Sequence, residues 1–401
     1  MLAVVAGCAP SLAADPATAG RSAIPTDGSG SATPSDPGAP TPIPTPIPTP
    51  TPAPLANDVA AAPCLATPRG GPYLQSTGHS FTCLGHPVEL TGYTFYPALL
   101  GGAAAWHRKT FPAYIDHILD MGAAAGQNLI RATDQWDPHA SGQTADDPVV
   151  WANMDYLIEA ARKRGVFVVV DLSAYRWLLV STGADPTRAD AWTGFIAFVA
   201  ARYRDATNVA YYSIAGEPAP PRTAAQKDSL VGFYQLTSHS LRAADPNHLI
   251  AVGGFNHMED SPQLGWWQAI DALPDNDIVA FKTYSQHDLD LMPAIAAYAT
   301  SIGKPAFDEE FGMPQGFGDG RFAGGAPYNG LASGRAAFFE AVYSKGRALG
   351  LAGYVFWNMG CQTGRTSYEV NPGTLEAWSV ISRNGAVASV GTPADATRLC
   401  G

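Results

Sequence analysis

Two glutamates in the sequence lie where their carboxyl groups could do acid–base or nucleophilic chemistry. Glu217 stands directly before a proline and Glu310 directly before a Phe-Gly pair, and each lies at or just beyond the end of a short apolar run. Cleavage of a glycosidic bond needs one carboxyl group that protonates the leaving oxygen and a second that attacks the anomeric carbon. The spacing between the two glutamates equals three strand–helix repeats of about 31 residues. The pattern therefore predicts a facing pair of carboxylates.

Charged and aromatic side chains also end or follow other apolar runs. Arg131 and Trp357 end two of these runs, and Tyr284 follows a third. Four tryptophans come soon after three of the runs, where exposed rings could stack on sugar faces: Trp136, Trp177, Trp266 and Trp267. For each tryptophan, packing in the core or at the rim is the alternative. These residues extend the predicted site from two carboxylates to a polar and aromatic cluster.

The elements that must position this cluster repeat along the chain as apolar runs separated by amphipathic stretches. The predicted strands are 88–94, 127–131, 166–172, 209–214, 248–253, 277–283, 305–309 and 353–357, and helical patterns include 151–164, 189–203, 224–244 and 334–349. Eight such units favour an α/β fold of the (β/α)8 TIM-barrel type, in which the carboxyl ends of the strands hold the active site. An open doubly wound sheet is the alternative, but the glycine-rich phosphate turn that it needs is absent from the sequence. A hairpin at 81–87 is predicted to cap the barrel floor.

Four stretches of sequence, in the right order, resemble the clan-A glycoside hydrolases and most closely glycoside hydrolase family 5. The stretches are 155–172, 198–218, 243–254 and 303–312, and the resemblance runs from about residue 81 to residue 357. It implies a retaining double displacement on a β-linked polysaccharide or oligosaccharide, as in cellulases and mannanases. Glu217 would be the general acid/base and Glu310 the nucleophile.

The resemblance also implies supporting roles for three residues and exposes three departures. Arg131 and Tyr284 match groups that support the nucleophile, and Trp357 matches the aromatic floor under the sugar at the cleavage point. Gly216 replaces the Asn that the family places before its acid/base, and Lys282 replaces a His. The family's His after the third strand is also absent. The sugar, endo or exo cleavage, and hydrolysis or transglycosylation therefore stay open, and a catalytically silent carbohydrate-binding barrel is the rival.

The first 60 residues differ in composition from the rest of the chain. Residues 1–15 contain Val-Ala-Gly-Cys8, which resembles the lipidation site of bacterial lipoproteins, although an Ala-rich tail with a stray cysteine is the alternative. Residues 16–60 are rich in Pro, Thr and Ser, and alternating proline favours an extended, disordered stalk. We expect the catalytic domain to span 61–401 and to be exported, either secreted or held at the cell surface by lipid.

Four further cysteines form an even set, as is typical of exported proteins. Cys64, Cys83, Cys361 and Cys400 allow three pairings, of which we favour Cys64–Cys83 and Cys361–Cys400. Metal and cofactor motifs are absent from the sequence, so neither is expected. The 35 acidic and 24 basic residues give a net charge of -11, which argues against nucleic acid as a partner. A monomer with a carbohydrate substrate is expected.

Overall fold

Eight parallel strands form the centre of the molecule. The computed structural model describes residues 56–97, 100–133, 147–173, 189–255, 261–315, 334–364 and 366–387. The strands are β4 (Leu90–Phe95), β5 (Leu129–Ala132), β6 (Phe167–Asp171), β7 (Val209–Ser213), β8 (Leu249–Ala251), β9 (Val279–Thr283), β10 (Ala306–Phe311) and β11 (Gly353–Phe356). They pair in the order β8-β7-β6-β5-β4-β11-β10-β9. Isolated parallel bridges, Ala251 to Ile278 and Phe255 to Phe281, join the two outer strands. The predicted (β/α)8 barrel is confirmed, and all eight predicted strands are present.

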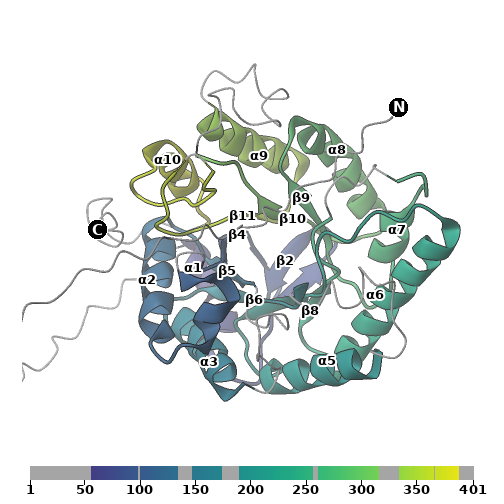
Figure 1. The fold of residues 1–401 in the computed structure, drawn as a ribbon, viewed down its shortest axis with the longest axis horizontal. Coiled ribbons are helices and arrows are strands. Elements are labelled where there is room, and N and C mark those ends of the chain that lie inside the picture. Colours follow the sequence, from purple (N-terminus) through teal and green to yellow (C-terminus); the bar gives the residue numbers. More distant parts are fainter. Residues whose placement is uncertain are drawn as a thin grey trace, which may run out of the picture. The chain divides into compact units, whose positions relative to one another are not determined.

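Helices surround the barrel (Figure 1) and alternate with its strands along the chain. In the described part of the chain they are η2 (Gly102–His107), α2 (Phe111–Ala124), α3 (Pro148–Lys163), α5 (Ala189–Tyr203), α6 (Ala224–Ala244), α7 (Trp266–Asp271), α8 (Gln286–Ser301), α9 (Arg335–Leu349) and α10 (Leu375–Arg383). An additional helix, α1 (Ala56–Ala66), begins within the last residues of the predicted linker. The predicted stalk up to residue 55 and the signal segment lie outside the described residues.

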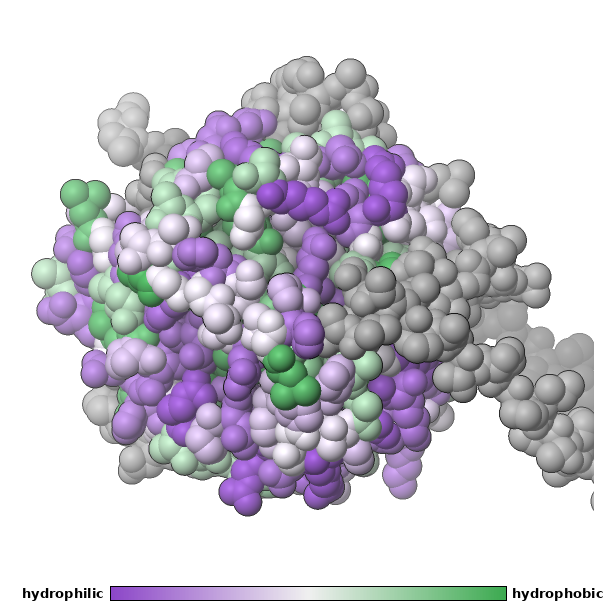
Figure 2. Space-filling model, turned by 180° about the vertical axis from the view of Figure 1, so that it is seen from behind, coloured by the Kyte–Doolittle hydropathy of each residue, from purple (hydrophilic) through white to green (hydrophobic). Residues whose placement is uncertain are grey.

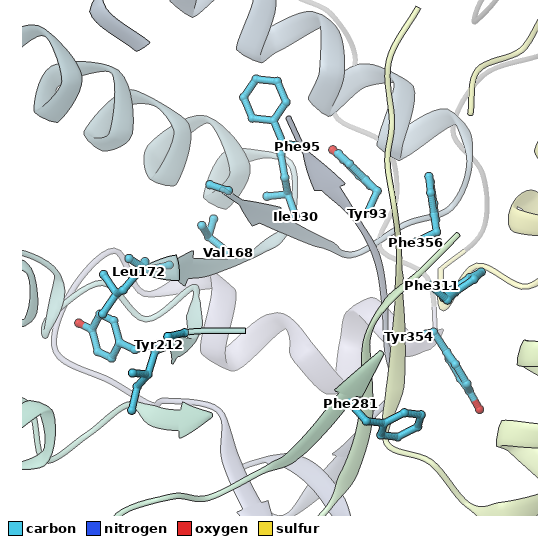
Figure 3. Close-up of a cluster of buried hydrophobic side chains, with 14 of the residues drawn as sticks. Tyr93, Phe95, Ile130, Val168, Leu172, Tyr212, Phe281, Phe311, Tyr354 and Phe356 are labelled. Carbon is cyan, nitrogen blue, oxygen red and sulfur yellow. The ribbon is translucent and has the colours of Figure 1, made fainter. Parts of the chain in front are cut away.

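Alternation along the strands sorts the apolar side chains into two clusters. Ile130 and Val168 belong to an outer cluster shared with the helices, and Figure 3 shows the side chains of this cluster directed away from the barrel strands. Leu129 and Phe167, their neighbours in sequence, belong to an inner cluster shared with the floor. Successive side chains of a strand point to opposite faces, so each strand serves both clusters.

The floor of the barrel is an antiparallel sheet joined to α1 by a disulfide. Its strands are β1 (Gln75–Thr77), β2 (Ser80–Cys83) and β3 (His86–Val88), which confirms the predicted hairpin. The ring of Phe81 on β2 contacts Phe307 of β10 edge-on, with centroids 5.6 Å apart. The predicted Cys64–Cys83 bond ties α1 to β2. Cys361 is also disulfide-bonded, whereas Cys400 and Cys8 lie outside the described residues, so the second pairing stays a prediction.

The surface is chemically mixed. In the view from behind, hydrophilic and hydrophobic residues alternate over the coloured part of the molecule (Figure 2). Of the helices in the described ranges, none is both long enough and apolar enough to cross a membrane.

Candidate active site

An irregularity in β10 turns two consecutive carboxylates into the barrel. The pairing of β10 with β9 shifts register between Asp308 and Glu310. Glu309 accepts a hydrogen bond from the backbone N–H of Gly254, while Glu310 contacts Lys282. Regular alternation would place these neighbours on opposite faces, and a β-bulge removes that constraint. Both glutamates are therefore directed inward.

Glu310 is held as a carboxylate by two cations and a hydroxyl. Nη1 of Arg131 lies 2.5 Å and Nζ of Lys282 lies 2.8 Å from its Oε2, and the Tyr284 hydroxyl donates to its Oε1. Burial raises the pKa of Glu310, but the charges of Lys282 and Arg131, together with hydrogen bonds from Lys282 and Tyr284, outweigh burial and lower it to about 2. Only 5% of the residue is exposed. Glu310 is thus ionised across the ordinary pH range.

Arg131 links this carboxylate to the neighbouring strands. It forms an ion pair with Asp171 at the end of β6, and its Nη1 donates to Oγ1 of Thr94 on β4 at 3.3 Å. Both members of the Arg131–Asp171 pair are buried. A guanidinium has a planar set of N–H donors, so one side chain can serve both acids. Arg131 therefore fixes the position of Glu310 relative to β4, β5 and β6.

Glu217 lies closer to solvent than Glu310 and has an uncommon backbone conformation. Its side chain is 30% exposed, against 6% for that of Glu310. Its φ of 55° lies in the left-handed region, which non-glycine residues rarely occupy and which recurs at active sites. The backbone N–H of Glu217 donates to the carbonyl of Gly254 at 3.0 Å. The turn after β7 is in this way anchored to the segment after β8.

Lys282 lies between the two glutamates. Its Nζ is 2.8 Å from Oε2 of Glu310 and 3.4 Å from Oε1 of Glu217. Those two oxygens can therefore be no farther apart than the sum of the two distances. A separation of about 5–5.5 Å, at which retaining glycosidases place their carboxyl groups, fits within this limit. The geometry is thus compatible with a retaining mechanism.

The departure at Gly216 is coupled to the departure at Lys282. A Cβ at position 216 would lie 3.3 Å from both Cε and Nζ of Lys282, and one at position 254 would lie 2.6 Å from its Cγ. The backbone N–H of Gly216 donates to Oγ of Ser173 at 3.1 Å. Ser173 in turn donates its own N–H to Oδ1 of Asp171 at 2.7 Å. Two glycines thus leave the space that the lysine occupies.

Trp357 and Tyr284 complete the group on the β10 and β11 side. The Trp357 ring stacks on Tyr96, with centroids 5.6 Å apart and planes at 27°. A Cβ at position 312 would lie 2.7 Å from the Trp357 carbonyl oxygen and 3.2 Å from Cε1 of Tyr284. The Phe-Gly pair after Glu310 therefore includes a glycine because the chain passes close to both aromatic residues.

The backbone of Tyr284 is fixed by the start of α8. Its N–H donates to Oδ2 of Asp288 at 2.8 Å, and Ser285 caps the helix by accepting from the N–H of Asp288 at 3.1 Å. This arrangement is a capped helix start, which defines the direction of the chain entering the helix. The hydroxyl of Tyr284 is thus delivered to Glu310 from a rigid junction.

The fold brings most of the predicted site residues together. Glu217, Glu310, Arg131, Tyr284 and Lys282 form one contact network, with Gly216 and Trp357 beside it. The predicted Trp136 and Trp177 lie outside the described residues.

Other participants were not predicted, although each follows or ends a strand. Thr94, Tyr96 and Ser173 contact the predicted residues, and Glu309 interacts electrostatically with Arg131. Their positions at strand ends are the signal that could have identified them. In the described ranges, His, Cys, Asp and Glu form no group of three placed to hold a metal ion.

A curated relative of this chain is an endoglucanase. Endoglucanase A of Evansella cellulosilytica is 28% identical over 183 residues, which is 45% of this chain and 35% of that protein. The chain thus spans about a third of the length of this curated relative.

Solved structures agree in fold. An endo-1,4-β-D-mannanase from Thermotoga petrophila RKU-1 superposes with a TM-score of 0.56 at 17% identity, covering 74% of this chain and 99% of the other. The catalytic domain of Thermobifida fusca endoglucanase Cel5A gives a TM-score of 0.52 at 19% identity, covering 78% and 96%.

The chain also matches a sequence family as a whole. The family described as cellulase (glycosyl hydrolase family 5) matches residues 84–326, which is more than half of the chain and extends from the floor sheet past the end of β10. Glu217, Glu310 and Lys282 all lie within the matched range. This chain belongs to glycosyl hydrolase family 5.

Proposed function

We propose that this protein is a retaining glycoside hydrolase that cleaves β-linked polysaccharides or oligosaccharides of the cellulose or mannan type. The observation that carries the proposal is the pairing of a buried, ionised Glu310 with a more exposed Glu217 across one lysine. Retaining enzymes need two such unlike carboxyl groups, one ionised for attack and one that exchanges protons with the leaving group and with water. Membership of family 5 supports the same chemistry.

The roles follow from the two environments. Glu310 is deep and surrounded by donors, which suits the nucleophile that bonds to the anomeric carbon. Glu217 is partly exposed, which suits a group that protonates the leaving oxygen and later takes a proton from water. Trp357, half-buried and stacked on Tyr96, supplies an aromatic surface for the sugar at the cleavage point.

The test is release of reducing sugar from a panel of β-glucans and β-mannans. The wild type should cleave at least one of them, and Glu310→Ala should lower kcat/KM on the order of 10⁴-fold. Binding without cleavage would show a silent carbohydrate-binding barrel instead. Product analysis at high acceptor concentration separates hydrolysis from transglycosylation.

Azide rescue distinguishes the two carboxylates. With an activated aryl β-glycoside, Glu217→Ala can still form the glycosyl-enzyme, so azide attack on it should yield a β-glycosyl azide. In Glu310→Ala azide must attack the substrate directly, and the product should be the α-glycosyl azide. The reverse pattern, or the same anomer from both variants, would overturn the role assignment.

We further propose that the protein acts outside the cell. The buried Cys64–Cys83 disulfide fits an oxidising compartment, where such bonds persist. Labelling with a radioactive fatty acid should mark the full chain and not its Cys8→Ser variant if the Cys8 anchor is real. An unlabelled wild type found in the medium would indicate a secreted form.

A further inference from the structure

Lys282 has an unusual place among the charged groups at the carboxyl ends of the barrel strands, which form the barrel mouth. Its ammonium contacts both carboxylates of the proposed reaction, Glu310 at 2.8 Å and Glu217 at 3.4 Å. Arg131, the other cation of the network, pairs with Glu310 and with Asp171. Of the cations in the described residues, Lys282 is thus the one in ion-pair contact with both glutamates.

The stem of Lys282 is enclosed, so its ammonium cannot move away into solvent. The residue is 4% exposed. Gly216 and Gly254 border the stem so closely that a Cβ at either position would touch it. β9 is paired with β10 at this point, with Lys282 opposite Glu310. The fold thereby fixes a positive charge between the two carboxylates.

We propose that Lys282 is the shared counter-ion for one negative charge that moves between Glu310 and Glu217 during the reaction, an inference that rests on the proposed function. Its ammonium balances Glu310 before glycosyl transfer and balances Glu217 afterwards. Lys282 therefore acts in both half-reactions.

The movement of charge follows from the chemistry of each half-reaction. In the first, an oxygen of Glu310 bonds to the anomeric carbon, the bond to the leaving oxygen breaks, and the proton of Glu217 passes to that oxygen. Glu310 becomes a neutral ester and Glu217 a carboxylate. In the second, the oxygen of water bonds to the anomeric carbon, the ester bond breaks, and a proton of water returns to Glu217. The pair carries one negative charge before and after each step, and only its position changes.

Other charged groups around the pair are tied elsewhere. Asp171 is paired with Arg131, and Glu309 accepts from Gly254. Tyr284 donates to Glu310, and Asp308 on the same strand also interacts with Glu310. Loss of Lys282 therefore removes a cation that is in ion-pair contact with both glutamates.

The proposal predicts two separate shifts in pH dependence. An opposite charge within about 4–6 Å lowers the pKa of a carboxyl group by about one unit or more. In Lys282→Met, the acid limb of kcat/KM, which reports Glu310 in the free enzyme, should move to higher pH by about one unit. The acid limb of kcat, measured where breakdown of the glycosyl-enzyme limits turnover, reports Glu217 and should move in the same direction by a similar amount.

The experiment uses the full chain and 2,4-dinitrophenyl β-cellobioside or β-mannobioside, whichever the wild type turns over faster. This leaving group needs no protonation, so the first half-reaction does not depend on Glu217. A pre-steady-state burst in the wild type shows that the covalent intermediate accumulates. Both limbs are then measured in wild type, Lys282→Met and Lys282→Gln, with circular dichroism melts to confirm folding.

Two variants serve as controls. Lys282→Gln keeps a donor at this position but has no charge, so it should shift both limbs as Lys282→Met does. Lys304→Met removes a half-buried lysine whose ammonium donates to the carbonyls of Asp271 and Leu273, away from the glutamates. It should lower stability and leave both limbs in place.

Three other outcomes would contradict the proposed role of Lys282. A shift of the kcat/KM limb alone would assign Lys282 to Glu310 only and overturn the shared role. Wild-type limbs in Lys282→Gln would show that hydrogen bonding rather than charge matters, and would also overturn it. If the wild type turns over neither glycoside and the glycan panel is also uncleaved, the proposed function fails and this inference fails with it.

Discussion

The two ends of the barrel are built from the same strands and have opposite chemistry. At the floor, β10 contributes Phe307, which is fully buried against Phe81 and Tyr211. Three residues further along the same strand, Glu310 lies among cations. Apolar burial at one end stabilises the fold, whereas at the other end charges are removed from water, at a cost that only close pairing offsets. Apolar packing and charged chemistry therefore occupy different ends of one set of strands.

We expect the largest effect from Arg131, a residue at the barrel mouth whose loss should lower both stability and activity. Arg131→Met leaves Asp171 and Glu310 without their shared guanidinium, and removal of one partner of a buried pair typically costs about 3–5 kcal/mol. Activity should fall on the order of 10²-fold because Glu310 is no longer held in place. Chemical denaturation and kcat/KM on the best glycan measure the two effects.

A surface pair provides the control for this prediction. Arg383 and Glu340 lie 2.6 Å apart, and about half of each side chain is exposed. Such pairs contribute about 0–1 kcal/mol, so Arg383→Met should change neither stability nor activity appreciably. If Arg131→Met were as stable as this control, the Arg131 ion pairs at the barrel mouth would contribute nothing to the free energy of unfolding. Stability and chemistry would then reside at separate ends of the barrel.

A change at the floor should affect stability alone. Phe307→Ala removes a ring whose centroid lies 5.6 Å from that of Phe81 and 5.7 Å from that of Tyr211. We expect a loss of about 3–5 kcal/mol in the free energy of unfolding, from lost burial and from the cavity left behind. Well below the melting temperature, kcat should stay within about twofold of wild type.

Phe198→Ala is the matched substitution, because Phe198 is 44% exposed. Its effect on unfolding should be below about 1 kcal/mol. A large fall in kcat for folded Phe307→Ala would show that floor packing positions the carboxylates, and the separation of the two ends would then be wrong.

The elements of the barrel were predictable because each leaves a local pattern. β7 begins at Val209 as predicted, and α5 and α6 have their predicted bounds, because apolar runs and amphipathic periodicity are properties of short windows. The end of β10 was less predictable. The strand continues to Phe311, two residues past its predicted end at residue 309, through the irregularity that turns Glu309 and Glu310 inward. A bulge depends on pairing with another strand, which is not visible in a short window.

The site was predictable by residue and not by arrangement. Strand-end positions and the family resemblance identified Arg131, Glu217, Glu310 and Tyr284, which the structure brings together. The fit between Gly216 and Lys282 could not be inferred, because it depends on how closely β7 and β9 approach across β8.

Two tryptophans show the same limit. Trp266 and Trp267, which could have stacked on a sugar from their place after the fifth strand, are 2% and 7% exposed and pack in the core at α7. Composition identifies an aromatic residue, whereas its exposure depends on the neighbours that the fold supplies.

The smallest expected effect concerns a single hydroxyl at the mouth. Tyr284→Phe removes the donor to Oε1 of Glu310 and keeps the ring. The pKa of Glu310 is lowered to about 2 despite burial, chiefly by the charges of Lys282 and Arg131, with this hydrogen bond contributing least among the named causes. Its loss disfavours the ionised form, so the acid limb of kcat/KM should move to higher pH by less than about one unit.

The same shift has a defined sign in stability. Because the pKa of Glu310 is lower in the folded chain than its ordinary 4.5, its ionisation stabilises the fold above that pH, and this contribution is lost as pH falls toward about 2. In Tyr284→Phe the pKa of Glu310 in the folded chain is higher, so this contribution is smaller and its loss is complete at a higher pH. The melting temperature should therefore fall by less than that of wild type between about pH 5 and about pH 2. Tyr343→Phe, which removes a buried hydroxyl on α9 that has no hydrogen-bond partner in the described ranges, should leave the acid limb unchanged. Equal limb positions in Tyr284→Phe and wild type would show that the two cations alone keep Glu310 ionised, so that the contrast between floor and mouth rests on charge pairing and not on this hydroxyl.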